Sequence, residues 1–263
     1  MSRIITLFEN LRKKKEKALG CFITAGDPDL STTHQLVLEM EKSGADFIEL
    51  GIPFSDPMAD GPVIQKSSER ALLQKTYLPQ IFKLVLDLRK KTEIPIVLMG
   101  YYNPILQYGC ESFCKESKRV GVDALIVVDL PPEESDELDL YAKRYGIHLI
   151  YLLTPTSNAA RIAKVKKKAS GFIYYVSMTG ITGSQLSSLK SIQKQVQAIQ
   201  SKIELPVCVG FGIQNPTQAK AISALADGIV VGSALVQLIE QSPKGKLMSE
   251  MRKKVTSLKK SLN

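Results

Sequence analysis

One stretch decides how this chain folds, and it reads Asp46-Phe-Ile-Glu-Leu-Gly-Ile-Pro-Phe-Ser-Asp-Pro-Met-Ala-Asp-Gly-Pro62. Its first six residues have the composition of a buried strand, with Glu49 among apolar neighbours. A carboxylate there is costly to keep ionised, so we expect Glu49 to be paired or to have a raised pKa. The strand runs into a proline-stiffened loop that carries Asp56 and Asp60. An acid in the wall facing a second acid on the loop suits general acid/base catalysis, whereas a structural Glu beside a solvated loop is the alternative.

Length and composition favour one large domain. The chain has 263 residues, of which 44% are hydrophobic, and an eight-stranded α/β barrel usually needs roughly 250 residues. No apolar run reaches the roughly 18 residues of a membrane span, and the first residues lack the pattern of a secretory signal. We therefore expect a single domain over residues 1–263, in the cytoplasm and not in a membrane.

Neither the cysteines nor the positive charge indicates a metal or a nucleic acid. The four cysteines include no Cys-x-x-Cys pair, and His34 and His148 stand alone, so we expect no metal site. The net charge is +9, and its basic runs lie at 12–15, 166–168 and 252–254. No aromatic residues interleave with these runs, so we interpret them as solvated helix faces. A positive field would also attract a small phosphorylated substrate.

Short apolar runs recur with helical segments between them. The eight predicted strands are 19–24, 47–51, 95–99, 124–128, 148–152, 172–177, 206–210 and 228–231. They are continuous rather than alternating, as in parallel strands covered on both faces. Eight β/α units favour a single closed (β/α)8 TIM barrel over an open doubly wound sheet. An extra N-terminal helix near 7–11 would close the bottom, and an amphipathic helix over 246–262 would pack on the outside.

Two of the connecting loops are long, and both follow predicted strands. One carries Asp56 and Asp60, and the other spans 177–188 and is rich in Gly, Thr and Ser. The second suits a mobile lid with flexible points at Gly180 and Gly183. The carboxyl ends of barrel strands carry functional groups, so both loops are expected at the catalytic face. Asp129, at the end of the fourth run, is either a functional group or an anchor for its loop.

Two glycine-containing strand ends predict a phosphate site. Gly210 and Gly212 end the seventh run, and Gly232 and Ser233 end the eighth. Glycine lets a phosphate approach backbone N–H groups, and a helix N-terminus adds its dipole. Barrels commonly bind phosphate between these two loops.

At this point the sequence resembles the tryptophan synthase α subunit family, over essentially its whole length. The matching segments are 22–28, 49–62, 99–104, 174–183, 210–213 and 231–233, and the long second segment is the specific one. The resemblance implies cleavage of indole-3-glycerol phosphate to indole and glyceraldehyde 3-phosphate, with no cofactor in this subunit. It also implies a pyridoxal-phosphate-dependent β subunit as partner, in an α2β2 assembly.

The resemblance also implies a role for each matching residue. Glu49 would be the general acid/base, Asp60 would hold the indole N–H, and Tyr174 would be the active-site tyrosine. The remaining substrate contacts would be apolar walls (Phe22, Met99 and Phe211), a phosphate cradle (Gly183, Gly212, Gly232 and Ser233) and a lid threonine that meets Asp60 (Thr182). For the three apolar residues, ordinary barrel packing is the alternative.

The rim of the catalytic face is the predicted partner surface. The loops after the second and third strands are expected to display Pro53, Asp56, Pro57, Met58, Tyr102, Asn103, Pro104 and Ile105. Exposed apolar residues at that face would need a partner. Two other functions stay open, namely another phosphate-binding barrel isomerase and a non-catalytic activator of a β subunit.

Overall fold

The protein is described from a computed structural model that covers residues 2–177, 185–210, 212–243 and 245–262. Within these residues every paired strand is parallel to its neighbours. The strands are β1 (Ala18–Thr24), β2 (Phe47–Gly51), β3 (Ile96–Gly100), β4 (Ala124–Val127), β5 (His148–Ile150), β6 (Leu152–Leu153), β7 (Ile173–Val176), β8 (Val207–Gly210) and β9 (Gly228–Val231).

The strand order closes the sheet into a barrel. The order is β5-β4-β3-β2-β1-β9-β8-β7-β6, so its two ends, β5 and β6, are neighbours in the chain. The predicted strand 148–152 is therefore divided at Tyr151, and its halves pair with different neighbours. Side chains keep alternating across the division, because Ile150 packs inside the barrel and Tyr151 outside. The prediction of an eight-stranded TIM barrel is confirmed, with the fifth strand split.

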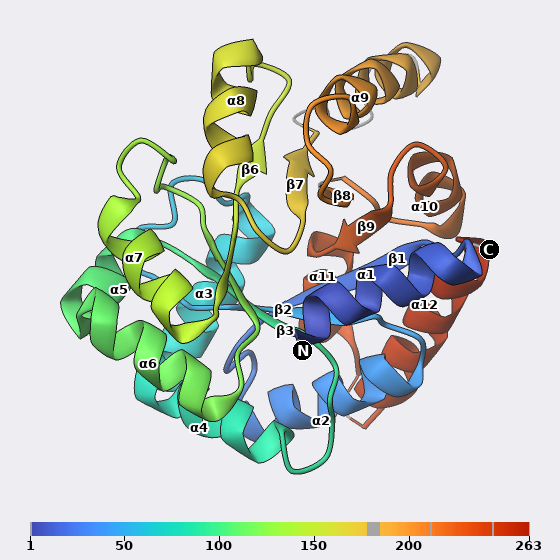
Figure 1. The fold of residues 1–263 in the computed structure, drawn as a ribbon. Coiled ribbons are helices and arrows are strands. Elements are labelled where there is room, and N and C mark those ends of the chain that lie inside the picture. Colours follow the sequence, from blue (N-terminus) through green and yellow to red (C-terminus); the bar gives the residue numbers. More distant parts are fainter. Residues whose placement is uncertain (1, 178–184, 211, 244, 263) are drawn as a thin grey trace.

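Helices cover the outside of the barrel (Figure 1). In the described residues they are α1 (Arg3–Lys14), α2 (Leu30–Lys42), α3 (Pro62–Leu73), α4 (Leu78–Leu88), α5 (Tyr102–Tyr108), α6 (Cys110–Val120), α7 (Asp136–Tyr145), α8 (Ala159–Lys168), α9 (Gln185–Gln200), α10 (Pro216–Ser223), α11 (Ser233–Gln241) and α12 (Leu247–Ser261). The predicted C-terminal helix is α12, which packs on α2, α10 and α11.

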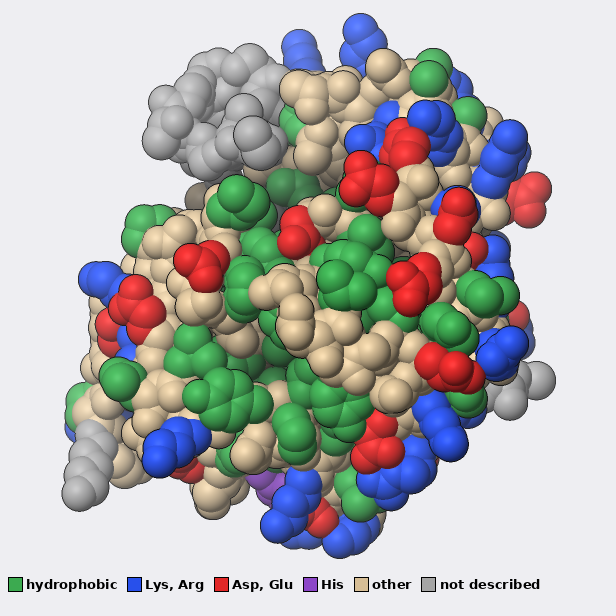
Figure 2. All heavy atoms as spheres, turned by 90° about the vertical axis from the view of Figure 1, so that its left-hand side faces the viewer, with side chains coloured by type: hydrophobic (Ala, Val, Ile, Leu, Met, Phe, Trp, Pro, Cys, Tyr) green, Lys and Arg blue, Asp and Glu red, His purple; other side chains and the backbone are tan. Residues whose placement is uncertain are grey.

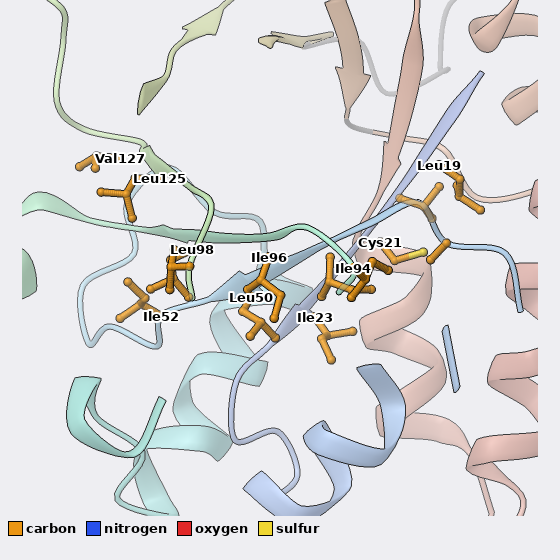
Figure 3. Packing of buried hydrophobic residues seen from close by; sticks show 14 of the residues in the cluster. Leu19, Cys21, Ile23, Leu50, Ile52, Ile94, Ile96, Leu98, Leu125 and Val127 are labelled. Carbon is orange, nitrogen blue, oxygen red and sulfur yellow. The ribbon is translucent and has the colours of Figure 1, made fainter. Parts of the chain in front are cut away.

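Strand alternation separates an outer core from an inner one. Leu19, Cys21 and Ile23 of β1 lie between the strands and the helices, as Figure 3 shows. The intervening Phe22 points into the barrel. Because side chains of a strand alternate between its two faces, Glu49 of β2 must also point inward, since Ile48 and Leu50 lie in the outer core.

The bottom of the barrel is closed by aromatic packing under α1. Phe8 of α1 lies 5.6 Å from Phe172 and 6.4 Å from Phe47, ring centre to ring centre. Phe47 and Phe172 are themselves 5.3 Å apart. Aromatic side chains at these separations bury large apolar areas, so the predicted N-terminal helix does close this end.

Candidate active site

Glu49 is an unpaired carboxyl group inside the barrel wall. It lies in β2 in register with Phe22 of β1 and Val97 of β3. Glu49 is fully buried, and neither of its carboxyl oxygens has a hydrogen-bond partner among the described residues. Burial raises the pKa of Glu49 from its ordinary value of 4.5 to about 8, because the charged form loses its hydration. Near neutral pH the group therefore holds a proton that it can give to a neighbour.

Asp60 is held at the mouth of the barrel by a tyrosine. It lies just before α3, and the Tyr101 hydroxyl donates to its Oδ2 at 3.0 Å. Burial raises the pKa of Asp60, while the hydrogen bond from Tyr101 opposes that rise. The hydrogen bond thus fixes the direction of the Asp60 carboxyl group, and its other oxygen, Oδ1, has no hydrogen-bond partner among the described residues.

Tyr101 is a site residue that sequence reasoning missed. It follows β3 directly, its hydroxyl accepts from Ala59 N at 3.0 Å, and its ring lies 5.2 Å from that of Phe54. These contacts tie the loop after β2 to the end of β3. The sequence held a signal, because Tyr101 stands two positions after Met99, at a strand end where barrels place functional groups.

Most of the predicted substrate contacts meet in one cavity of about 210 Å³. Its predicted lining residues are Phe22, Glu49, Asp60, Met99, Tyr174, Gly212, Gly232 and Ser233, and those not predicted are Gly61, Ile64, Ile213, Gln214 and Val230. Three predicted contacts, Thr182, Gly183 and Phe211, lie outside the described residues, as does the proposed lid glycine Gly180.

Tyr174 forms one wall of this cavity. It is buried on the inner face of β7, while Tyr175 packs in the outer core, as predicted. Burial first, then the nearby Glu49, raises the pKa of Tyr174 well above its ordinary value. The hydroxyl therefore stays protonated. Gly210 leaves it room, since a Cβ there would lie 2.0 Å from the Tyr174 oxygen.

Two glycines and the start of a helix line another part of the cavity. Gly212 has φ +78°, a conformation that favours glycine, and it precedes α10, which is capped by Asn215 accepting from Gln218 N at 3.0 Å. Gly232 precedes α11, where no side chain caps the first turn. The N-terminus of α11 at Ser233 therefore presents backbone N–H groups and a helix dipole toward the cavity.

The predicted rim is only partly exposed. Asp56 and Asn103 are exposed, and Pro57 and Pro104 are half-buried. The prediction that Pro53 and Ile105 are displayed to solvent is wrong. Pro53 is buried because it directly continues the wall from Ile52, and Ile105 because it lies on the core side of α5.

Met58 is a highly exposed residue of the predicted rim. It is 86% exposed, and it stands between Asp56 and Asp60. Asp129 accepts from Tyr102 N at 2.8 Å, which favours its role as a loop anchor.

The helices and the cysteines of the described chain give two further observations. No helix within it combines the length and apolarity needed to cross a bilayer. All four cysteines are buried and carry free thiols.

Comparisons with known proteins point to one family. The family model described as Tryptophan synthase alpha chain matches residues 8–263. The Tryptophan synthase alpha chain of Geotalea uraniireducens (strain Rf4) is 56% identical over 259 residues, which cover 98% of this chain and 97% of that relative. The Tryptophan synthase alpha chain of Thermoanaerobacter sp. (strain X514) is 46% identical over 263 residues, 100% of each chain.

Solved structures agree. Tryptophan synthase subunit alpha from Legionella pneumophila str. Paris superposes with a TM-score of 0.93 at 38% identity, covering 100% of this chain and 98% of that one. Aminoacrylate-bound tryptophan synthase from M. tuberculosis gives a TM-score of 0.90 at 28% identity, with 100% of both chains covered.

Proposed function

The chain belongs to the tryptophan synthase alpha chain family, and we propose that Glu49 and Asp60 carry the family's reaction in this protein. That reaction is the lyase step of tryptophan biosynthesis, in which indole-3-glycerol phosphate is cleaved to indole and glyceraldehyde 3-phosphate. The observation that carries the proposal is the fully buried, unpaired carboxyl of Glu49 in the same cavity as Asp60.

The chemistry requires one proton to arrive and another to leave. C3 of the indole gains a proton, the hydroxyl next to the breaking C–C bond loses one, and the bonding pair returns to the ring. Glu49 is protonated near neutral pH because burial raises its pKa to about 8. It can give its proton to C3 and, as the carboxylate, take the hydroxyl proton, so that the enzyme is restored within one turnover.

Asp60 stabilises the charge that this protonation creates. Addition of a proton at C3 places positive charge on the ring nitrogen, and an anion fixed beside the N–H lowers the energy of that state. The hydrogen bond from Tyr101 to Asp60 Oδ2 leaves Oδ1 available to accept the indole N–H. Tyr101 thereby acts as a positioning residue, whereas Tyr174, Phe22 and Met99 form the walls against which the ring is held.

The phosphate end of the substrate is held by backbone groups. Gly212, Gly232 and the N-terminus of α11 at Ser233 line the end of the cavity, where N–H groups and the helix dipole favour an anion. We extend this cradle to Gly183, and we place Thr182 beside Asp60 and Phe211 against the indole, on the basis of the sequence resemblance alone.

We further propose that the rim docks a pyridoxal-phosphate-dependent β subunit, in a cytoplasmic α2β2 assembly. Among the rim residues, Asp56, Met58 and Asn103 are exposed, and Pro57, Tyr102 and Pro104 are half-buried. Hydrophobic side chains gather on the face that includes α5 and α7 (Figure 2), and Leu106 of α5 is 47% exposed. An exposed apolar surface of this kind suits a protein partner.

A direct assay separates the three functions still open. Purified protein is incubated with indole-3-glycerol phosphate, and free indole and glyceraldehyde 3-phosphate are quantified with and without the β subunit. The proposal predicts both products in equal amounts. Isomerised substrate without indole would favour a barrel isomerase, and turnover only from the partner would favour a non-catalytic activator.

A further inference from the structure

Arg70 of α3 joins three elements that surround the cavity. Its Nε and Nη2 donate to the two carboxylate oxygens of Asp27, each at 2.8 Å, in a two-pronged ion pair. Asp27 follows β1 and is fully buried. The third nitrogen, Nη1, donates to Glu240 of α11 at 2.9 Å. One guanidinium therefore links the β1 loop, α3 and α11.

The two helices joined by Arg70 carry opposite ends of the proposed site. Helix α3 begins at Pro62, two residues after Asp60, and α11 begins at Ser233. Both pack on β1 and on each other. Helix α3 is also fixed to β1 by a buried hydrogen bond of 2.6 Å between the Thr24 and Ser67 hydroxyls. Among the described contacts, Arg70 with Glu240 is a polar link that runs directly between α3 and α11.

From this arrangement we propose that Arg70 is a positioning residue, which sets the spacing between the indole-binding and phosphate-binding ends of the site. The proposal rests on the function proposed above. Indole-3-glycerol phosphate must reach Asp60 with its ring while its phosphate lies at Gly232 and Ser233. A covalently linked substrate is sensitive to that spacing, because an error of about 1 Å in placement can cost up to roughly 10² in rate. Indole and glycerol 3-phosphate added as separate molecules are not sensitive to the spacing, since each needs only its own half of the site.

The ion pair has the chemistry that such a role needs. A guanidinium presents its donors in a rigid planar fork, so it fixes direction as well as distance, which a lysine ammonium does not. Loss of Arg70 would leave Asp27 buried without its ion-pair partner and would disturb the fold. Glu240 is the better position to change, because its side chain is 38% exposed and the Asp27 pair stays intact.

The test compares the linked substrate with its fragments. Glu240→Ala and Arg70→Lys are assayed for kcat/KM with indole-3-glycerol phosphate and for inhibition constants of indole and of glycerol 3-phosphate. We expect kcat/KM to fall roughly three- to tenfold in Glu240→Ala and at least as far in Arg70→Lys. The inhibition constants of both fragments should change less than about twofold, because each half-site is intact.

A matched control is available in another interhelical ion pair. Glu39 of α2 accepts two hydrogen bonds from Arg252 of α12, at 2.6 and 3.0 Å, and neither helix carries a residue of the cavity. Glu39→Ala should leave kcat/KM unchanged within about twofold, whatever it does to the thermal midpoint.

Two results would overturn the spacing role. One is an unchanged kcat/KM in Glu240→Ala. The other is a parallel weakening of both fragments together with a lowered thermal midpoint, which is what a purely stabilising bridge would produce. Wild-type protein assayed alongside separates this proposal from the proposed function, since an absence of indole from wild type would reject the function itself.

Discussion

Glu49 combines an electrostatic cost to the fold with the chemistry proposed for it. A buried carboxyl without a partner is unfavourable when charged, so its pKa rises toward the pH at which the enzyme would work. In the mechanism that we propose, the same property makes the group a proton donor that returns to its starting state after each turnover. The cost to the fold and the usefulness to catalysis therefore have one physical origin, and both can be measured.

The pH dependence of stability reports this cost. The folded pKa of Glu49 is about 8 and its ordinary value is 4.5, so between these values the folded protein holds more protons than the unfolded chain. The contribution of Glu49 to the free energy of unfolding is fully present below pH 4.5 and is lost as the pH rises through 8. In Glu49→Gln the fall in unfolding free energy from pH 5 to pH 8 should be smaller than in wild type by a few kcal/mol, at about 1.4 kcal/mol per pKa unit. Urea titrations at both values measure it.

Glu204→Gln is the control for that comparison, because Glu204 is an exposed acid outside the cavity. It should leave the pH dependence as in wild type. If Glu49→Gln also left it unchanged, the carboxyl would not be buried as an acid with a raised pKa.

Tyr101 should affect Asp60 in a way that a pH profile reveals. Its hydrogen bond lowers the pKa of Asp60 against the effect of burial, so Tyr101→Phe should raise that pKa. The acid limb of kcat/KM should move to higher pH, and kcat should fall about tenfold, in line with one hydrogen bond to a charged group. Asp60→Asn should cost more, because the anion itself is lost.

The neighbouring tyrosine supplies the comparison. Tyr102→Phe removes a hydroxyl whose hydrogen-bond partner in the described residues is Cys110 Sγ, at 3.4 Å. The acid limb of kcat/KM against pH in Tyr102→Phe should match that of wild type. An acid limb that stayed in place in Tyr101→Phe would mean that the hydrogen bond does not control Asp60.

At the scale of single elements, the strand-end loops decide what the barrel can bind. The loops after β8 and β9 carry Gly212 and Gly232, which line the part of the cavity that we propose binds the phosphate. Gly212→Val should therefore raise KM about tenfold or more and weaken inhibition by inorganic phosphate, with a smaller change in kcat. Steady-state kinetics at several phosphate concentrations measure both effects.

Part of any change at Gly212 comes from backbone strain, because its φ is +78°. Gly245 has φ +82° and a Cβ there would meet nothing within 4 Å. Gly245→Val is thus a control with similar strain outside the cavity lining. Equal rises in KM for both variants would show that strain alone, and not blocked access, is responsible.

Sequence periodicity was sufficient to locate the barrel elements. β2 and β9 have the predicted limits, and the others differ by a residue or two at their ends. The division at Tyr151 could not be predicted, because both halves carry the same apolar pattern and only the change of pairing partner separates them.

For the site, the sequence was informative about residue type and less so about contacts. That Glu49, Asp60 and the glycine loops would line the cavity could be predicted, because an acid in an apolar strand, or acids and glycines at strand ends, favour a functional role. The partner of Asp60, Tyr101, could not, since a tyrosine at a strand end packs equally well in a core. The burial of Pro53 was missed for a related reason, because proline composition alone does not distinguish a wall residue from an exposed turn.

At the scale of the whole molecule, the rim is the surface that we propose connects the site to a partner. The loop after β2 carries Asp60 at one end and Asp56, Pro57 and Met58 nearer its middle. Contact with a β subunit can therefore reposition the acid and raise the population of the reactive arrangement. Pro57→Ala or Asn103→Ala should reduce the stimulation of turnover by the β subunit severalfold, with a smaller effect on isolated activity.

Leu73 offers an exposed apolar control at 80% exposure, outside the rim loops. Leu73→Ser should leave stimulation by the β subunit intact. If the rim variants lost isolated activity and were still fully stimulated, the coupling between partner contact and Asp60 would be wrong.

The central claim is that Glu49 carries the proton, and one rate tests it most directly. The kcat for release of indole from indole-3-glycerol phosphate is measured for wild type and for Glu49→Gln, each with saturating β subunit. Glutamine keeps the shape and removes the titrating proton, so kcat should fall by roughly 10² to 10⁴ while phosphate still binds. A variant that kept turnover near the wild-type value would contradict the account.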